Sequence, residues 1–267
     1  MENLDREIID KAIEYGALLA GVVNVEDLKR SPSHTIVGKM PPFEGEGTKD
    51  VEGRKRMEVT WPEGMKTSIV LAGDHPDDQP QLDWWVKGGK GGTKGNLIMM
   101  RIVSKLVKWL DETKGIKSEK LPYFIEQGAV FMKDTSVLGG LGCIGRNNIL
   151  VTRDHGSRLR LRVFMIDYEL PSTGAIDFDP CVDCQGHCRK ACPQNAFREK
   201  TYSPEEYGQK ELPGRNGVFD RIKCNYQMEI DNANFEEVQI EGQAEPTTRV
   251  KYCRKCELAC PVGRKNP

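Results

Sequence analysis

Apolar residues in the first third of the chain are spaced like those of helices and strands. Over residues 3–17 they follow helical spacing, which predicts an amphipathic helix. Short apolar runs at 19–23 and 67–73 predict buried strands, and residues 27–30 predict a short helix or turn. Residues 31–53 are rich in proline, glycine and charge, so they predict a long surface loop.

A second helix is predicted in the middle of the chain. Apolar residues from Met99 to Leu110 form one helical face, so the helix is expected to begin at Asn96, as its cap, and to run to Asp111. The preceding stretch 87–95 alternates glycine and lysine but lacks the spacing of a phosphate-binding loop. A mobile surface loop is the favoured interpretation, with a lid over a substrate as the alternative.

Residues 123–130 are expected to form a strand or an extended segment of a functional site. Residues 139–148 form a glycine-dense turn. Residues 149–152 and 159–166 then alternate like two strands of a hairpin. In the second of these strands, one face is expected to carry Leu161, Val163 and Met165, and the other Arg160, Arg162 and Phe164.

Composition narrows the class of protein. The 267 residues can form one large domain or two smaller ones, and a formal net charge of −1 gives no general attraction to nucleic acid or membrane. The charged N-terminus is unlike a signal peptide and has no twin-arginine motif. No apolar run approaches the ~18 residues typical of a spanning helix. We therefore expect a cytoplasmic protein with no membrane partner.

Eight of the nine cysteines lie in the last third of the chain, in the runs CVDCQGHCRKACP at 181–193 and CRKCELACP at 253–261 and at Cys224 between them. Clustered cysteines in a chain without a secretion signal favour metal ligands over disulfides. In two-cluster ferredoxins, the cysteine before proline ligates the other cluster. This rule predicts two [4Fe–4S] clusters, one bound by Cys181, Cys184, Cys188 and Cys260, the other by Cys253, Cys256, Cys224 and Cys192.

Two observations qualify this prediction. Three residues separate Cys184 from Cys188, where ferredoxins usually have two, and Gly186 is expected to accommodate the extra residue as a bulge. A structural zinc site is the alternative, because such sites also use Cys-x-x-Cys pairs. His187 is expected to face solvent or to form a hydrogen bond, since the cysteines already complete the ligand count.

Several segments resemble epoxyqueuosine reductases, and more distantly reductive dehalogenases. They are LGCIGRNNI at 141–149, GSRLRL at 156–161 with Asp167, and Cys224-Asn225-Tyr226. The resemblance implies an α/β (α+β) fold, with a nitroreductase-like domain at 1–175 and a ferredoxin-like domain at 176–267. It also implies a cobalamin without its own base as lower ligand, reduced by the two clusters.

The resemblance also implies functional side chains. By offset from the glycine segment, Glu126 matches the family's proton donor and Asp134 is the second candidate, while an ordinary surface carboxylate is the alternative for each. Cys143 stands where the family has tryptophan, and an inert buried thiol is favoured over contact with the corrinoid. The expected cofactor-binding residues are Gly142, Cys143, Gly145, Arg146, Asn147 and Asn148. Arg158, Arg160 and Arg162 are expected either to bind phosphate or carboxylate or to form a solvated strand face.

The first functional hypothesis is a cobalamin- and cluster-dependent reductase, supplied with electrons by a low-potential ferredoxin or flavodoxin. Its substrate is expected to be a small molecule or a corrinoid, because a near-neutral chain ending at Pro267 lacks the helical repeats that help the family bind tRNA. The alternatives are a reductase that reactivates the corrinoid of another protein and a non-enzymatic, ferredoxin-like electron carrier.

Overall fold

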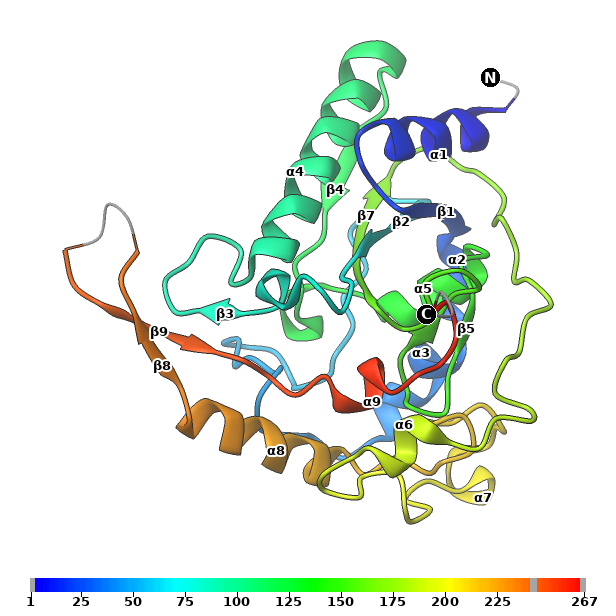
Figure 1. Ribbon diagram of the computed structural model, residues 1–267. Coiled ribbons are helices and arrows are strands. Elements are labelled where there is room, and N and C mark those ends of the chain that lie inside the picture. Colours follow the sequence, from blue (N-terminus) through cyan, green and yellow to red (C-terminus); the bar gives the residue numbers. More distant parts are fainter. Residues whose placement is uncertain (1–2, 241–243, 265–267) are drawn as a thin grey trace.

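The computed structural model describes residues 3–240 and 244–264. Its central sheet has the strand order β1 (Leu19–Asn24), β2 (Thr67–Asp74), β7 (Leu159–Ile166) and β4 (Ser118–Lys120) (Figure 1). All three pairings in this sheet are antiparallel. The predicted α+β class is therefore confirmed, as are the strands predicted at 19–23, 67–73 and 159–166.

The two faces of the sheet are covered by different helices. On one face α1 (Leu4–Glu14) and α4 (Lys94–Trp109) pack through apolar stripes against a core that includes Phe164. On the other face α2 (Val25–Lys29) and α5 (Met132–Leu138) cover a second core that includes Val163 and Met165. The alternation predicted for 159–166 is thus confirmed, because its successive apolar residues enter opposite cores.

The predicted surface loop at 31–53 is wrong at its beginning. It starts with α3 (Pro32–Ile36) and the 3-10 turn η1 (Val37–Lys39), and irregular chain follows. Pro32 occupies the first helical position, where its fixed φ favours helix and its missing N–H costs no hydrogen bond. The high proline and glycine content of the whole stretch concealed this local start signal.

The helix predicted from Asn96 begins two residues earlier, at Lys94, and its cap is Thr93 rather than Asn96. The Thr93 hydroxyl accepts a hydrogen bond from the Asn96 N–H at 3.1 Å. The helix continues into a π-helical turn, η3 (Leu110–Lys114). Most of the predicted glycine and lysine loop at 87–95 is loop, after β3 (Trp85–Val86), and only its last two residues belong to α4.

Two further predictions are corrected. Residues 123–130 contain the 3-10 turn η4 (Ile125–Gln127) and no strand. The strand β6 (Leu150–Val151) does not form a hairpin with β7. It pairs instead with β5 (Cys143–Ile144), within the glycine-dense segment. Gly142 permits this pairing, because a Cβ atom there would lie 2.1 Å from the Val151 carbonyl oxygen.

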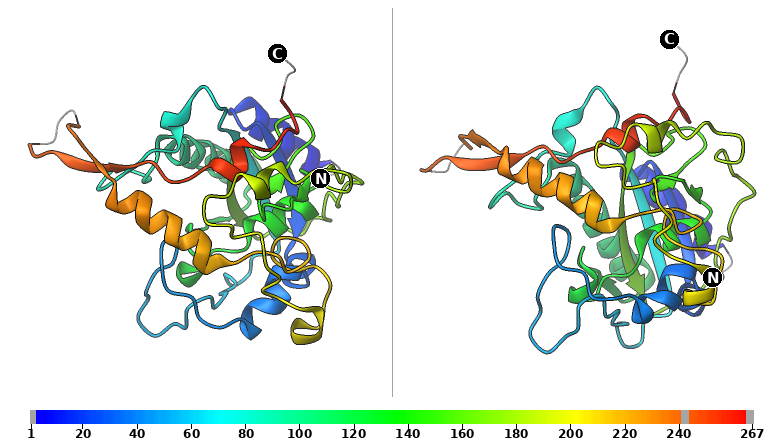
Figure 2. Two further views of the ribbon diagram at one scale, coloured as in Figure 1. Left: turned by 60° about the horizontal axis from the view of Figure 1, so that its bottom comes forward. Right: turned by 90° about the horizontal axis from the view of Figure 1, so that it is seen from below.

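The C-terminal third contains short helices and an antiparallel hairpin. The helices are α6 (His187–Lys190), α7 (Pro204–Tyr207), α8 (Arg221–Ala233) and α9 (Lys255–Leu258). The hairpin of β8 (Glu236–Val238) and β9 (Thr247–Val250) projects from the body of the molecule (Figures 1 and 2). β9 also pairs with β3, so the hairpin is joined to the first half of the chain.

The division into domains at 175/176 stays a proposal, and the β3–β9 pairing crosses it. Among the described residues, none of the helices combines the length and the apolar character needed to cross a bilayer.

Candidate functional site

The eight clustered cysteines fall into two neighbourhoods where α6 packs against α9. In the first, Cys181, Cys188 and Cys260 are buried and Cys184 is half-buried. Burial raises the pKa of the Cys188 thiol to about 11, and the thiolates of Cys260, Cys181 and Cys184 act in the same direction. The side chain of Cys260 therefore lies among the cysteines of the other run.

The second neighbourhood contains the remaining four cysteines. Burial raises the pKa of Cys256, and the thiolates of Cys224, Cys253 and Cys192 raise it further. Cys192 belongs to the first run, so each run contributes one cysteine to the neighbourhood of the other. The Cys192 thiol also accepts a hydrogen bond from the Ala196 N–H at 3.3 Å.

These two groups have the membership predicted for the ligand sets. Four thiols in one buried place repel one another as thiolates, and the positive charge of an iron core offsets that repulsion. The donor chemistry therefore fits two iron–sulfur clusters. None of the nine cysteines forms a disulfide, and within residues 3–240 and 244–264 no three histidine, cysteine or acidic side chains are close enough to bind one metal ion.

The extra residue between Cys184 and Cys188 lies where the chain enters α6. Gly186 precedes that helix with φ 72°, a left-handed conformation that glycine adopts without strain. His187 is the first helical residue and is exposed. The longer loop is therefore absorbed by a turn that orients Cys188 toward the first group.

The glycine-dense segment binds the backbone of both cysteine runs. Arg146 donates to the carbonyl oxygens of Cys184 at 2.8 Å and Val182 at 3.1 Å. Asn147 donates to the carbonyl oxygen of Cys256 at 3.4 Å. These two side chains thus contact one loop of each predicted ligand set, and their corrinoid-binding role stays a prediction.

The other predicted cofactor-binding residues have local structural roles. Asn148 adopts φ 58°, and its side-chain oxygen accepts a hydrogen bond from the Gly214 N–H at 3.0 Å. At Gly145, a Cβ atom would lie 2.7 Å from the Asn147 side chain, which would have to shift, whereas at Gly142 it would meet backbone. The corrinoid-binding role of these residues also stays a prediction.

Cys143, the ninth cysteine, lies beside the first group. It is half-buried, and burial raises the pKa of its thiol to about 11, with the nearby Cys181 thiolate acting in the same direction. A neutral thiol at this position agrees with the inert role favoured by the sequence.

The alternative of an ordinary surface carboxylate is wrong for both acid candidates, because Glu126 is 3% exposed and Asp134 is 2% exposed. The Glu126 carboxylate accepts a hydrogen bond from the Met57 N–H at 3.2 Å. Arg54 donates to the Glu126 carbonyl oxygen at 2.8 Å. Glu126 thus lies beneath the irregular chain that follows η1.

Asp134 is saturated with hydrogen bonds from the start of α3. Its carboxylate accepts from the Ser31 hydroxyl at 2.9 Å, the Ser33 N–H at 2.6 Å and the Ser33 hydroxyl at 2.8 Å. Asp134 is therefore a structural carboxylate that joins α5 to α3. Of the two candidates, Glu126 therefore keeps the stronger claim to a chemical role.

The alternative of a solvated strand face is wrong for two of the three arginines, because Arg158 is 7% exposed and Arg162 is 8% exposed. Arg158 donates to the carbonyl oxygens of Cys260 at 3.2 Å and Val262 at 2.8 Å. Arg160 forms ion pairs with Asp83 and Glu257. Both arginines therefore connect β7 and the turn before it with the second cysteine run.

Sequence reasoning missed Asp83, His75, Arg254 and Glu257, which form a buried polar network with Arg160. It also missed Lys133, whose ammonium group donates to the Asn148 carbonyl oxygen at 2.7 Å. Burial lowers the pKa of Lys133 to about 8, although nearby Asp134 opposes the shift. The partners of Arg160 are distant in sequence, so no spacing signal marked them. The Arg254–Glu257 pair is three positions apart and was the one local signal that could have been used.

A cavity of 430 Å³ lies between α8 and residues 42–44. It is lined by Phe43, Ile222 and Tyr226, together with Asn225, whose side-chain oxygen is buried without a partner. Pockets for drug-sized ligands measure roughly 300–1,000 Å³, so this cavity has room for a small ligand. A whole corrinoid is considerably larger. In the described arrangement this cavity does not fit a corrinoid.

No protein-family model matches the chain. Among curated proteins, the epoxyqueuosine reductase of Aliivibrio fischeri is 24% identical over 167 residues, or 62% of this chain and 40% of that protein. The match thus spans less than half of the relative's length. The resemblance to this family is confirmed at the level of sequence.

Solved structures of the same family and of a reductive dehalogenase resemble this chain. The epoxyqueuosine reductase from Streptococcus thermophilus has a TM-score of 0.61 and 19% identity, covering 99% of this chain and 68% of that protein. A reductive dehalogenase described as B12-dependent has a TM-score of 0.57 and 18% identity, covering 97% of this chain and 31% of its own length. At these identities the likeness establishes a shared fold.

Proposed function

We propose that the chain is a two-cluster iron–sulfur reductase of the epoxyqueuosine reductase type. The observation that carries the proposal is the grouping of eight cysteines into two sets of four, each drawing on both runs. A low-potential ferredoxin or flavodoxin in the cytoplasm supplies the electrons, which the clusters accept one at a time.

Cobalamin is proposed from the resemblance alone. The cavity beside α8 is too small for it and gives it no support. When bound, a cobalamin supplies a reduced cobalt that carries out difficult reductions. Within this chain, Glu126 is the proposed proton donor, because it is buried and its carboxylate accepts a hydrogen bond from Met57, whereas three hydrogen bonds occupy Asp134.

The substrate is proposed by class. One neighbouring solved structure is an epoxyqueuosine reductase with an epoxyqueuosine-modified tRNA-Tyr stem loop, which makes a modified nucleoside in RNA one candidate. A small molecule remains the preferred substrate, because the near-neutral net charge of −1 provides little attraction to a polyanion.

A ferredoxin-like electron carrier is the second candidate. The grouping of the eight cysteines is the observation that favours it, because a carrier needs only the two clusters.

Anaerobic reconstitution with iron, sulfide and cobalamin distinguishes the two candidates. The reductase requires about eight irons per chain, together with cobalt that remains bound after gel filtration. Eight irons without cobalt would leave only the carrier. Binding of zinc in place of iron would overturn both. An epoxyqueuosine-modified stem loop is then the first substrate to test, with the unmodified stem loop as the matched control.

A further inference from the structure

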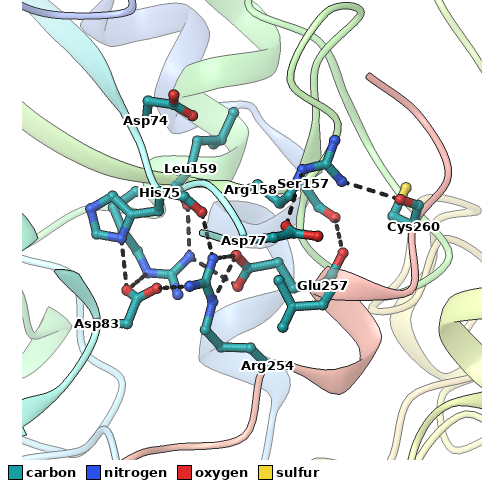
Figure 3. Close-up of polar contacts among 12 residues, drawn as sticks. Asp74, His75, Asp77, Asp83, Ser157, Arg158, Leu159, Arg254, Glu257 and Cys260 are labelled. Atoms are coloured by element: carbon teal, nitrogen blue, oxygen red, sulfur yellow. Dashed lines mark hydrogen bonds and ion pairs between the residues drawn. The ribbon is translucent and has the colours of Figure 1, made fainter. Parts of the chain in front are cut away.

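A largely buried network of charges joins α9 to the central sheet (Figure 3). Glu257 lies on α9, and Arg254 is the residue before that helix. Asp83 comes from the segment after β2, and Arg160 comes from β7. Two carboxylates and two guanidinium groups face one another, so the charges of these four side chains balance.

Asp83 is the centre of this network. One carboxylate oxygen lies 2.7 Å from His75 Nδ1 and 2.8 Å from Arg160 Nε, and the other lies 2.7 Å from Arg254 Nη1. Burial alone would raise the pKa of Asp83, but the hydrogen bond from His75 and the charges of Arg160 and Arg254 outweigh it and hold that pKa below its usual value. Asp83 is therefore an anion that contacts three partners.

Glu257 completes the network on α9. Its carboxylate accepts a hydrogen bond from Arg160 Nη1 at 3.0 Å and another from Arg254 Nε at 3.1 Å. Its carbonyl oxygen accepts a hydrogen bond from the Ser157 hydroxyl at 3.0 Å. The side chain of Glu257 is thus bound to β7, and its backbone is bound to the turn before β7.

The position of α9 matters because two ligand sets meet at its C-terminal end: Cys256 is on the helix and Cys260 follows it by two positions. Cys256 lies in one group of thiols and Cys260 in the other, only four positions along the chain. The matching pair is Cys188, on α6, and Cys192, two positions after that helix. The arginine of α6, Arg189, donates to the carbonyl oxygens of Arg146 and Gly214 and to an amide oxygen, not to a carboxylate. Charged contacts to the sheet therefore fix α9, whereas neutral acceptors hold α6.

We propose that Asp83 is a positioning residue for electron transfer: through Arg254, Arg160 and Glu257 it fixes α9 and thereby the separation of the two clusters. This inference rests on the proposed function, because it requires both clusters. Its physical basis is that the Asp83 carboxylate attracts both guanidinium groups as an ion-pair partner, and that their charge-assisted hydrogen bonds to Glu257 are directional. Partners beyond the ligands orient a metal site in the same way.

The test measures the magnetic interaction between the two reduced clusters by low-temperature electron paramagnetic resonance. Asp83→Asn removes the charge that holds both arginines. The magnetic interaction should then weaken, or the spectral lines that report it should broaden, while about eight irons per chain remain. Asp83→Glu keeps the charge and should preserve the interaction. Asp78→Asn, an exposed carboxylate in the same segment, is the matched control and should leave the spectrum unchanged.

Arg160→Lys provides a second route if Asp83→Asn fails to fold. Lysine keeps the positive charge but lacks the fork that contacts Asp83 and Glu257 together, so the same spectral change is expected. An unchanged interaction in a folded variant with eight irons would overturn the inference. A wild-type protein that never holds two clusters would instead overturn the proposed function.

Discussion

At the scale of single residues, the surroundings of two buried carboxylates separate their roles. Three hydrogen bonds to Ser31 and Ser33 occupy Asp134, whereas the Glu126 carboxylate accepts one, from Met57. The resemblance ranked Glu126 first and Asp134 second, and the hydrogen bonds of the two carboxylates support that order. The partners of Asp134 lie about a hundred positions away, where no local pattern marks them.

The first prediction concerns Glu126. If it donates the proton, Glu126→Gln should lower turnover of an epoxyqueuosine-modified stem loop by about 10²-fold or more, because a positioned acid contributes 10²–10⁴-fold. Iron and cobalt content should stay at the wild-type level. Glu119→Gln, at an exposed position on β4, serves as the control. Unchanged turnover in Glu126→Gln would rule out the acid role.

His34 links folding stability to pH. Its Nδ1 lies 2.8 Å from the Ser31 hydroxyl, and its Nε2 accepts a hydrogen bond from the Phe131 N–H at 3.3 Å. Protonation would remove that acceptor. Burial lowers the pKa of His34 to about 4, although the charge of Asp134 opposes the shift. The folded protein therefore holds His34 neutral where an unfolded chain binds a proton.

The second prediction follows from the sign of this shift. As pH falls from 7 to 5, the unfolded chain gains the proton first, so the free energy of unfolding should drop by up to about 2 kcal/mol. His34→Gln should show a smaller dependence over the same range. Anaerobic urea unfolding of both proteins at several pH values provides the measurement, and parallel pH curves would contradict the assignment to His34.

At the scale of elements, short-range patterns identified the helices and strands of the central layers. Apolar periodicity located α1, α4, β1, β2 and β7, because each buries one face or both. Periodicity could not assign the partner of β6. A two-residue strand carries too little pattern, and the β5–β6 pairing depends on glycines that allow a close approach of the backbone.

The third prediction tests that approach. Gly142→Ala should destabilise the fold by about 1–3 kcal/mol, because the new methyl group would overlap the Val151 carbonyl oxygen. Gly38→Ala is the matched control, since a Cβ atom there meets nothing within 4 Å. Midpoints of thermal or urea unfolding compare the two variants. Equal midpoints would show that Gly142 is not needed for packing.

At the scale of the whole molecule, the cysteine spacing predicted the membership of both thiol groups. Each run ends in Cys-Pro, and in two-cluster ferredoxins the cysteine before proline ligates the other cluster. The contacts that place the two groups against the sheet were not predictable. Asp83 and Arg254, for example, are brought together only by the complete fold.

The fourth prediction concerns cluster assembly. Cys188→Ser should reduce the iron content from about eight to about four per chain, because one ligand set loses a thiolate while the other remains complete. Cys143→Ser should retain all eight irons, since the proposed sets do not include it. Iron analysis and absorption spectra after anaerobic reconstitution check both. Loss of four irons in Cys143→Ser would make Cys143 a ligand.

The hydrogen bonds from Arg146, Asn147 and Arg158 to the cysteine runs all end on carbonyl oxygens. Every amino acid provides that acceptor, so the contacts of Arg146 do not depend on which side chains stand between Cys181 and Cys188. Evolution can therefore change the exposed residues of these loops, or their length, without altering the surface that receives them. The same property makes the 181–188 loop a practical site for grafting: a ferredoxin loop of regular spacing should be accepted by an unmodified scaffold.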